Sequence, residues 1–261
     1  MPLHGDPERI LLVRLSAIGD AILTLPMLCA LRRRFPKAYI AWVAEPGPAK
    51  IIGGHEALDE LIVVRKGWMR HPSQVWQLRR QLRRLCFDLA LDSQGLTKSS
   101  VVAWLSGAPR RIGFTKPWGR ELSPWLNNDL QTPRVAHVVD RLLGMLEPLG
   151  IVNPKAEFNI PGNSQAEESI ADMLVQQQVG SPLVVINVGA GWFSRVWPPE
   201  RFGAVAKHLA ARHQISSLVV WAGEQELEWA REIERSSEGA ARLAPPTSLG
   251  ELTALLRRAN L

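Results

Sequence analysis

The feature that most constrains the fold of this chain is a repeated alternation between short apolar runs and longer segments with helical spacing. The run at 9–15 is typical of a strand, and residues 20–34 after it carry apolar side chains on one helical face. The alternation predicts further strands at 39–44, 61–64, 87–91 and 111–114, and helices at 72–85, 96–105 and 135–149. Strands that alternate with helices form parallel βαβ units, so we expect an α/β fold with helices on both faces of a parallel sheet.

A second α/β series follows a stretch at 150–162 that contains proline, glycine and asparagine. We place a domain boundary there and predict an N-terminal domain at 1–160 and a C-terminal domain at 161–261. The second series predicts strands at 182–188 and 218–221 and helices at 165–178, 199–212, 224–235 and 249–258. Ligands of such folds bind outside the carboxyl ends of the strands, so the functional residues are expected in the loops that follow them.

Charge is distributed unevenly along the chain. The 261 residues carry a net charge of +6. Residues 1–150 contain 21 Lys and Arg against 13 Asp and Glu, a balance of +8, whereas residues 151–261 contain 10 against 12, a balance of −2. The first domain is therefore expected to meet an anionic partner. Nucleic acid, an anionic membrane surface and a phosphorylated or acidic-sugar substrate all fit that sign.

Composition excludes several classes of protein. With 46% apolar residues the chain is not disordered. Cys29 and Cys86 form no CxxC pair and are expected to be small buried side chains, so neither a disulfide scaffold nor a structural zinc site is predicted. The histidines form no HExxH pair, and no metal site is assigned. Because the chain contains neither a run of about 18 apolar residues nor a leader peptide, we expect a soluble, cytoplasmic protein.

The first strand ends in a loop, residues 15–20, that contains one glycine and a carboxylate, Asp20. Neither the GxGxxG pattern nor a GK[ST] phosphate loop is present, which disfavours a glycine-rich dinucleotide site and a Walker ATPase. An ionised Asp20 at the carboxyl end of the strand is suited to take a proton from a hydroxyl nucleophile, as glycosyl transfer requires. The competing interpretation is a helix N-cap.

Three later loops also carry polar groups beyond a strand. Residues 92–98 end in Lys98, which either holds an anionic acceptor or is a solvated lysine on a capped helix. Residues 187–198 contain two glycines that allow close approach to a phosphate, and Arg195, which is suited to stabilise a diphosphate leaving group; a plain loop is the alternative. Glu226 lies past the next strand, where its carboxylate is suited to bind a ribose or sugar. The alternative is an acidic residue that stabilises the first turn of a helix.

Arginines and tryptophans are the other conspicuous residue types. The chain has ten tryptophans, most of which we interpret as packing residues. The arginines at 32–34 and the set Arg79, Arg80, Arg83 and Arg84 are most simply solvated helix faces, and as a group they are also suited to contact anionic lipid head groups. They are spread over helices without a recognised nucleic-acid motif, so no nucleic-acid partner is expected.

Several of these segments together resemble the ADP-heptose:lipopolysaccharide heptosyltransferases of glycosyltransferase family 9, most of all the heptosyltransferase I branch. Residues 10–20 are similar to the first strand and S-x-x-G-D loop of that family, and residues 92–98 to its D-x-Q-G-L-x-K-S segment. Arg120, His137 and the stretch from Gly189 to Pro198 follow in the family's order. The resemblance implies a GT-B fold of two Rossmann-like domains, the first holding the lipid-linked acceptor and the second the nucleotide sugar.

The resemblance also implies an activity: inverting, metal-independent transfer of L-glycero-D-manno-heptose from ADP-heptose to Kdo of the lipopolysaccharide inner core in Gram-negative bacteria. It places Asp20 as the general base. The implied acceptor-binding residues are Ser16, Gly19, Gln94, Lys98, Arg120 and His137. The implied nucleotide-sugar-binding residues are Gly189, Ala190, Gly191, Arg195 (where the family commonly has lysine), Glu226 and Thr247, the last near the adenine. No cofactor is expected, and the acceptor would be a Kdo-lipid A at the inner face of the inner membrane.

One departure from the family pattern affects the second domain. A segment similar to residues 255–261 leads, in the family, into another strand and then a D-[ST]-G-x-x-H motif that binds the diphosphate, and this sequence contains neither. The second sheet is therefore expected to be incomplete. Two alternatives remain open: a family 9 transferase with another sugar or acceptor, and a non-catalytic module that binds lipid or glycan. The sequence does not assign an oligomeric state.

Overall fold

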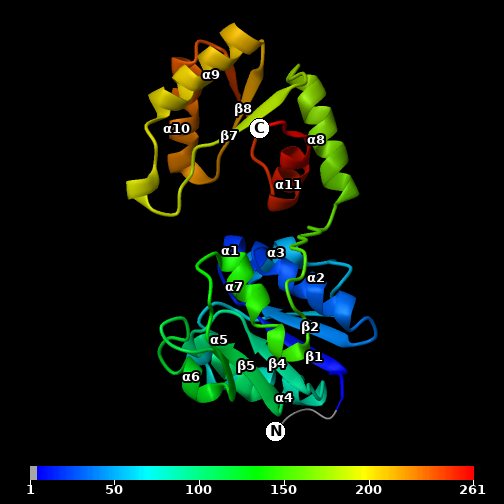
Figure 1. Ribbon diagram of the computed structural model, residues 1–261. Helices are drawn as coiled ribbons and strands as arrows, with labels where there is room; N and C mark the ends of the chain where they lie inside the picture. The colour runs from blue at the N-terminus through cyan, green and yellow to red at the C-terminus, as the bar shows by residue number, and fades with distance from the viewer. Residues whose placement is uncertain (1–4) are drawn as a thin grey trace. The chain divides into compact units, whose positions relative to one another are not determined.

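The computed structural model describes residues 5–261, which divide into two compact units between Pro161 and Gly162. Each unit is an α/β fold built on its own parallel sheet (Figure 1). The division lies one residue from the boundary predicted from the sequence. The predicted fold class, two α/β units with parallel sheets, is confirmed.

The sheet of unit 1, the residues up to 161, is wholly parallel and has the order β3-β2-β1-β4-β5-β6. Its strands are β1 Arg9–Val13, β2 Tyr39–Ala44, β3 Glu60–Val63, β4 Leu89–Asp92, β5 Arg110–Phe114 and β6 Asp129–Gln131. From β1 the chain proceeds outward to β2 and β3, and it then returns to β4 on the other side of β1 and continues to β6. The order thus reverses between β1 and β4, and the loops after these two strands diverge to leave a crevice at their carboxyl ends.

Helices cover both faces of this sheet because the strands are apolar on both sides. Ile10 and Leu12 of β1 face one core together with α1 (Ile18–Ile22), α2 (Leu25–Arg34), α3 (Pro46–Ile52) and α7 (Val138–Gly144). Leu11 and Val13 face a second core together with α4 (Pro72–Arg84) and α5 (Thr97–Ser106). The short helix α6 (Ser123–Leu126) packs against α5, and single 3-10 turns lie at η1 (Trp68–Arg70) and η2 (Glu147–Leu149).

Two predicted helices of unit 1 are each divided in the structure. The segment at 20–34 forms α1 and α2, which are separated at Leu23 and Thr24 because Pro26, in the first turn of α2, cannot continue a helix begun upstream. The segment at 135–149 forms α7 and then η2, where Pro148 ends regular helix. The cysteines also differ from each other, since Cys29 is buried as expected but Cys86, after the end of α4, is exposed.

Unit 2, residues 162–261, has the parallel sheet β7-β8-β9, formed by Leu183–Asn187, Ser216–Val220 and Ala241–Leu243. Helices α8 (Ser164–Gln176) and α11 (Leu249–Arg258) pack on one face. Helices α9 (Pro199–His213) and α10 (Gly223–Ser236) pack on the other. Asn260 and Leu261 hydrogen-bond to β7 at the edge opposite β8. The sequence predicted two of these strands and missed β9, whose three residues are too few to show a period.

Candidate active site

The carboxylate of Asp20 lies at the carboxyl edge of the unit 1 sheet, on the third residue of α1. Its Oδ2 forms an ion pair with Nη2 of Arg14 at 3.0 Å and accepts a hydrogen bond from the backbone N–H of Ala17 at 3.3 Å. The side chain is 47% exposed, and no described residue donates a hydrogen bond to its Oδ1. Asp20 is therefore not the N-cap itself; it stabilises the start of α1 with Oδ2, and its Oδ1 accepts no hydrogen bond from the described residues.

Arg14, directly after β1, holds Asp20 in this place. The residue is 9% exposed, and its Nη1 donates a hydrogen bond to the carbonyl of Ser93, in the loop after β4. Burial lowers the pKa of Arg14, and the neighbouring carboxylate of Asp20 opposes that shift. One guanidinium thus ties the loop after β1 to the loop after β4. In the sequence this role is marked only weakly, by a charged residue that interrupts an apolar run.

A second set of contacts joins the same two loops. Nζ of Lys98 donates to Oγ of Ser16 at 2.7 Å and to Oε1 of Glu45 at 2.9 Å. Gln94 accepts a hydrogen bond from the backbone N–H of Leu15 at 2.9 Å, and its Nε2 lies 3.4 Å from Oγ of Ser16. The structure therefore brings together Ser16, Gln94 and Lys98. Glu45, which follows β2 and was not predicted, completes the set as the counter-ion of Lys98.

The loop after β4 is held in place by Asp92, whose side chain is fully buried. Its Oδ1 accepts from the backbone N–H groups of Gln94 and Gly95, and its Oδ2 accepts from Ser123 and Asn127 of the α6 segment. Burial raises the pKa of Asp92, and these hydrogen bonds act against that rise. Asp92 is thus a structural residue that shapes the loop carrying Gln94 and Lys98.

A cavity of about 450 Å³ opens at this edge of the sheet. Its lining includes three arginines, Arg14, Arg120 and Arg141, together with Gln94. The guanidinium of Arg141 lies 3.8 Å from the ring centre of Trp118, which also lines the cavity. Burial lowers the pKa of Arg141, and the charge of Arg14 acts in the same direction. Guanidinium groups bind carboxylate and phosphate in bidentate geometry, so the cavity is suited to an anionic ligand.

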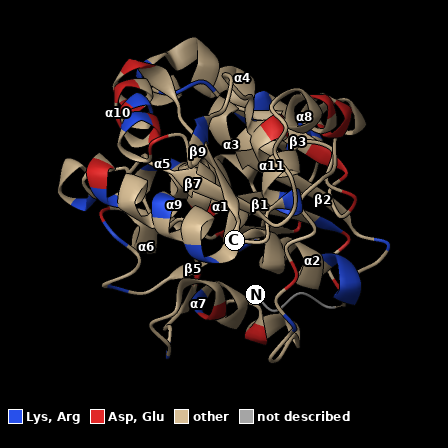
Figure 2. Cartoon of the chain, turned by 90° about the horizontal axis from the view of Figure 1, so that it is seen from above, with Lys and Arg blue, Asp and Glu red and all other residues tan. Residues whose placement is uncertain are grey.

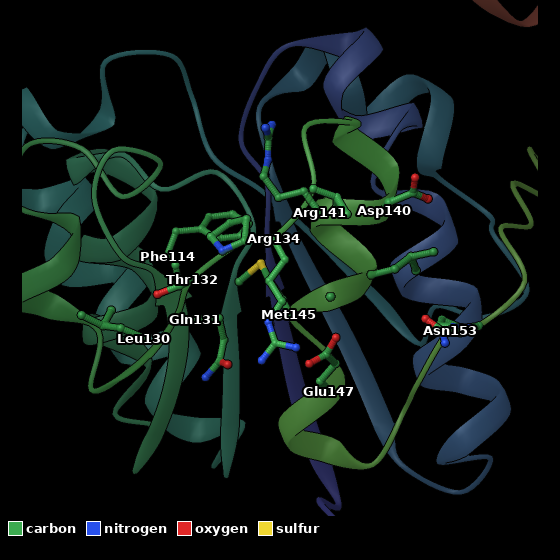
Figure 3. Close-up of a pocket in the computed structure, with 15 residues that line it drawn as sticks. Phe114, Leu130, Gln131, Thr132, Arg134, Asp140, Arg141, Met145, Glu147 and Asn153 are labelled. Atoms are coloured by element: carbon green, nitrogen blue, oxygen red, sulfur yellow. The ribbon is translucent and has the colours of Figure 1, made fainter.

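A larger cavity of about 660 Å³ lies next to the first and shares Phe114 and Arg141 with it. Figure 3 shows it between β5 and β6 on one side and α7 with the following turn on the other. Gln131, Arg134 and Glu147 are among its polar lining residues. None of the residues predicted to bind the acceptor lines it, whereas the smaller cavity is lined by Gln94, Arg120 and Arg14, the ion-pair partner of Asp20, so the acceptor is assigned to the smaller cavity.

The remaining predicted acceptor residues are less closely associated with Asp20. Arg120 lines the smaller cavity, and its backbone N–H donates to the carbonyl of Gly95 at 2.8 Å. Gly19 lies in α1 next to Asp20, where a Cβ atom would meet no other atom within 4 Å. His137 precedes α7, is 70% exposed and pairs with Asp140, with 3.3 Å between Nδ1 and Oδ2. No described contact joins His137 to the Lys98 set.

In unit 2 the structure places Glu226 against the loop after β7. A Cβ atom on Gly189 would lie 2.2 Å from Oε1 of Glu226, so only glycine leaves room for this carboxylate. Oε2 of Glu226 accepts from the backbone N–H of Ala222 at 2.8 Å, and Oδ1 of Asn187 lies 3.4 Å from the N–H of Gly189. The loops after β7 and β8 therefore meet at one carboxylate at the carboxyl edge of the sheet.

The other residues predicted to bind the nucleotide sugar are less closely associated with Glu226. Ala190, Gly191 and Arg195 are exposed, and Thr247 is half-buried just before α11. Arg195 ends the 3-10 turn η3 (Phe193–Arg195) and forms no ion pair with the described residues. No hydrogen bond within residues 5–261 joins Arg195 or Thr247 to Glu226. The structure thus brings together Gly189 and Glu226 but does not join Arg195 or Thr247 to them.

Over residues 5–261, no group of three or more His, Cys, Asp or Glu side chains has the arrangement of a metal site. Within the same residues, no helix combines the length and the hydropathy needed to cross a bilayer.

Comparison of the sequence with known families gives a match over most of the chain. The profile of glycosyltransferase family 9 (heptosyltransferase) matches residues 75–261. Lipopolysaccharide heptosyltransferase 1 of Pseudomonas aeruginosa is 27% identical over 97% of this chain and 71% of its own length. The protein of the same name from Escherichia coli K12 is 26% identical over 97% of this chain and 86% of its own length.

Several solved structures of similar fold are family 9 glycosyltransferases or heptosyltransferases. A glycosyl transferase of family 9 from Veillonella parvula superposes with a TM-score of 0.81, at 24% identity over 98% of this chain and 74% of its own. E. coli heptosyltransferase WaaC, solved with ADP, superposes with a TM-score of 0.74, at 24% identity over 95% of this chain and 78% of its own. At such identity these likenesses concern the fold, which is of the GT-B type that the sequence predicted.

Proposed function

The chain belongs to glycosyltransferase family 9 and is a glycosyltransferase, and from this premise we propose that it is a lipopolysaccharide core heptosyltransferase. The proposed reaction transfers L-glycero-D-manno-heptose from ADP-heptose to a hydroxyl of Kdo in the inner core, with inversion at the anomeric carbon. One observation carries the proposal: a half-exposed carboxylate, Asp20, with one oxygen held by a buried arginine and the other open at the carboxyl edge of the sheet.

In the proposed mechanism Asp20 acts as the general base. The acceptor hydroxyl attacks the anomeric carbon from the face opposite the diphosphate, the bond to ADP breaks, and the hydroxyl proton passes to Oδ1 of Asp20. The ion pair with Arg14 through Oδ2 keeps the carboxylate oriented while Oδ1 accepts that proton. A base held in this way is aligned before the substrate arrives, which lowers the entropy cost of the reaction.

The acceptor is proposed to bind in unit 1. Kdo carries a carboxylate and lipid A carries phosphates, and the cavity beside Asp20 offers the guanidinium groups of Arg120 and Arg141, while that of Arg14 is held by Asp20 and Ser93. Lys98, held by Glu45 and Ser16, adds a further cation at the same edge of the sheet. The balance of +8 over residues 1–150 supports an anionic acceptor on this side.

The donor is proposed to bind in unit 2, at the loops after β7 and β8. Glu226 is suited to accept hydrogen bonds from the ribose hydroxyls, and exposed backbone N–H groups from Gly189 to Gly191 are suited to the diphosphate. Arg195 has no carboxylate partner among the described residues and is suited to neutralise the leaving group, and Thr247 is assigned to the adenine side. We propose that no metal or other cofactor takes part, and that the enzyme works in the cytoplasm at the inner face of the inner membrane.

The proposal is tested first by calorimetric titration of the protein with ADP, with UDP and GDP as controls. ADP-selective binding is expected. Transfer is then measured with ADP-heptose and Kdo-lipid A, beside a panel of other ADP-sugars and acceptors. Activity with a different sugar or acceptor alone would replace the substrates named here and keep the enzyme class, whereas ADP binding without any transfer would favour a binding module.

The role of Asp20 is tested by Asp20→Asn, which keeps the shape of the side chain and removes its basicity. A general base contributes about 10²–10⁴-fold to a rate, so kcat is expected to fall by that factor while the Kd for ADP is unchanged. Glu147→Gln, in the larger neighbouring cavity, is the matched control and should keep wild-type turnover. Wild-type kcat in D20N would remove Asp20 from the mechanism.

A further inference from the structure

Helix α4 has two opposite faces of different character. Leu78 and Leu82 are buried against the sheet of unit 1. Trp76 and four arginines follow one another at positions i, i+3, i+4, i+7 and i+8, which places them on one side of the helix, away from those leucines: Trp76, Arg79, Arg80, Arg83 and Arg84. The Trp76 side chain is 59% exposed, so this side of the helix carries an apolar ring among four cations.

Two further helices, one packed next to α4 and the other packed next to the first, carry exposed tryptophans. Helix α5 packs against α4 on the same face of the sheet and is largely buried, but its Trp104 is 46% exposed. The adjoining helix α6 carries Trp125, which is 82% exposed. We call the seven residues together the tryptophan–arginine face: Trp76, Arg79, Arg80, Arg83, Arg84, Trp104 and Trp125.

The arginines of this face are not neutralised by the protein. Within residues 5–261 no ion pair involves Arg79, Arg80, Arg83 or Arg84. The other arginine run of unit 1 behaves differently, since Arg32, Arg33 and Arg34 on α2 are paired with Asp59, Glu157 and Asp6. In unit 2, α10 carries both signs along its length, as Figure 2 shows. Helix α4 therefore carries four arginines in a row along one side without an ion pair among the described residues, unlike the paired arginine run of α2.

The five side chains of α4 also surround a surface hollow of about 390 Å³, and among residues 5–261 they are the ones that line it. Within it the guanidinium of Arg80 lies 5.3 Å from the ring centre of Trp76. Arg83 is anchored, because its Nε donates to the carbonyl of Leu105 and its guanidinium covers Gly107. The hollow therefore combines cations with an apolar ring, a pair of properties that suits a phosphate group attached to a hydrocarbon chain.

We propose that the tryptophan–arginine face is a docking surface for an anionic phospholipid bilayer, with the lipid phosphates at the α4 arginines and the indole rings at the level of the head groups. Tryptophan favours this interfacial position because one end of the ring is apolar and the other polar. Each basic residue near an anionic leaflet adds to the attraction. This inference goes beyond the proposed function, since it names the surface that meets the membrane and does not depend on the sugar transferred.

The test is co-sedimentation of the full chain with vesicles of phosphatidylcholine, alone or mixed with phosphatidylglycerol. We expect the wild-type protein to sediment with the mixed vesicles and to be released by high salt. The triple variant R79Q/R80Q/R84Q, which spares the anchored Arg83, should lower the partition coefficient roughly a hundredfold. The double variant W76A/W125A should lower it about tenfold.

The matched control removes the same charge elsewhere. R201Q/R212Q/R231Q changes three exposed arginines of unit 2 that form no ion pair in the described chain, and it should bind vesicles like the wild type. Equal loss of binding in this control would overturn the proposal, because net charge rather than a surface would then be responsible. No preference of the wild type for anionic vesicles, or capture of a single-stranded RNA in their place, would also overturn it.

A second readout separates this proposal from the proposed function. With a water-soluble acceptor that lacks acyl chains, the α4 variants should turn over at the wild-type rate, because none of the altered residues lines the cavity beside Asp20. With acceptor embedded in anionic vesicles, their turnover should fall together with their vesicle binding. Vesicle binding without any transfer would leave the docking surface standing and contradict only the proposed function. Equal losses with both acceptors would assign these arginines to the acceptor site and overturn the docking proposal.

Discussion

The position of the proposed base depends on one guanidinium. Arg14 contacts Asp20 with one Nη and the loop after β4 with the other, from a site where almost none of its surface is exposed. A buried charge is tolerated only when it is paired and hydrogen-bonded, and Arg14 satisfies this through both loops of the crevice. Its role is therefore to position the carboxylate rather than to touch the substrate's reacting atoms.

Arg14→Lys tests this positioning role. Lysine keeps the charge but presents a single ammonium in place of a fork, so it cannot reach both Asp20 and the Ser93 carbonyl. We expect kcat to fall at least about tenfold with little change in donor KM, and the free energy of unfolding to fall by about 1–3 kcal/mol. Steady-state kinetics measures kcat and KM, and urea unfolding measures the free energy of unfolding. Arg134→Lys, in the other cavity, should change neither; unaltered kcat in R14K would show that Asp20 needs no such support.

The sequence predicted some of the residues that meet at this edge of the sheet and missed others for a physical reason. Asp20 and Lys98 lie in the first turns of the helices that follow β1 and β4, and Gln94 lies in the loop after β4. A local pattern of polar residues after a strand predicted Asp20 and Lys98, and the family resemblance added Gln94. Arg14 and Glu45 act through partners that are distant in sequence, because Arg14 bonds to Ser93 and Glu45 to Lys98. Such pairs exist only once the strands have assembled, so no local pattern marks them.

Among the elements, the loop after β7 has the sharpest steric constraint. A Cβ atom on Gly189 would overlap the carboxylate of Glu226, whereas one on Gly191 would meet nothing within 4 Å. The overlapping atom is the end of a flexible side chain, so a larger residue at 189 would displace Glu226 and leave the β7 backbone where it is. Replacing one glycine or the other therefore separates the position of Glu226 from the general properties of the loop.

For Gly189→Ala we expect a loss of stability of about 0.5–1.5 kcal/mol, because the Ala222 N–H loses its acceptor, and a weaker affinity for ADP. Gly191→Ala should leave the free energy of unfolding unchanged. The double variant G189A/E226Q should bind ADP no more weakly than G189A alone, since both changes remove the same contact. Calorimetry and urea unfolding provide these values. Wild-type ADP affinity in G189A would exclude Glu226 from the nucleotide site.

At this scale the sequence predicted long elements well and short ones poorly. The strand at 39–44 has the predicted bounds, and α4 and α9 differ from their predictions by a residue at one end. The elements that were missed, such as α3, β6 and β9, contain three to seven residues. A hydrophobic period cannot be recognised in so few positions, and these elements form because longer neighbours provide a surface for them.

For the whole molecule, the segment before the second unit is fastened to the first. Nδ1 of the buried His55 accepts from the backbone N–H of Ala57 at 3.0 Å, and its Nε2 lies 3.4 Å from the carbonyl of Phe158. These two contacts fit the neutral ring with its proton on Nε2. A second proton, on Nδ1, would face the N–H of Ala57. Burial lowers the pKa of His55, and the neighbouring Glu56 only partly opposes this.

This arrangement predicts a pH dependence with a definite sign. The folded state disfavours the charged ring, so the unfolded chain binds more protons below the ordinary histidine pKa of about 6.5, and stability is lost as the pH falls through that region. Hydrogen exchange at residues 158–160 should accelerate over the same range. His55→Asn should make both dependences flatter. An identical slope in H55N and the wild type, measured by urea unfolding from pH 7.5 down to about pH 5, would assign the effect to other groups.

The central place of β1 in its sheet has a consequence for synthesis on the ribosome. One neighbour of β1, β4, lies about 80 residues later in the chain, which at roughly 5–20 residues per second is a delay of about 4–16 s. During that time the edge of β1 that later pairs with β4 is unpaired. The helices already synthesised have apolar sides that lack a complete sheet to pack against. Chaperones recognise such surfaces, so the order in which the strands emerge exposes this chain to them before the crevice between β1 and β4 exists.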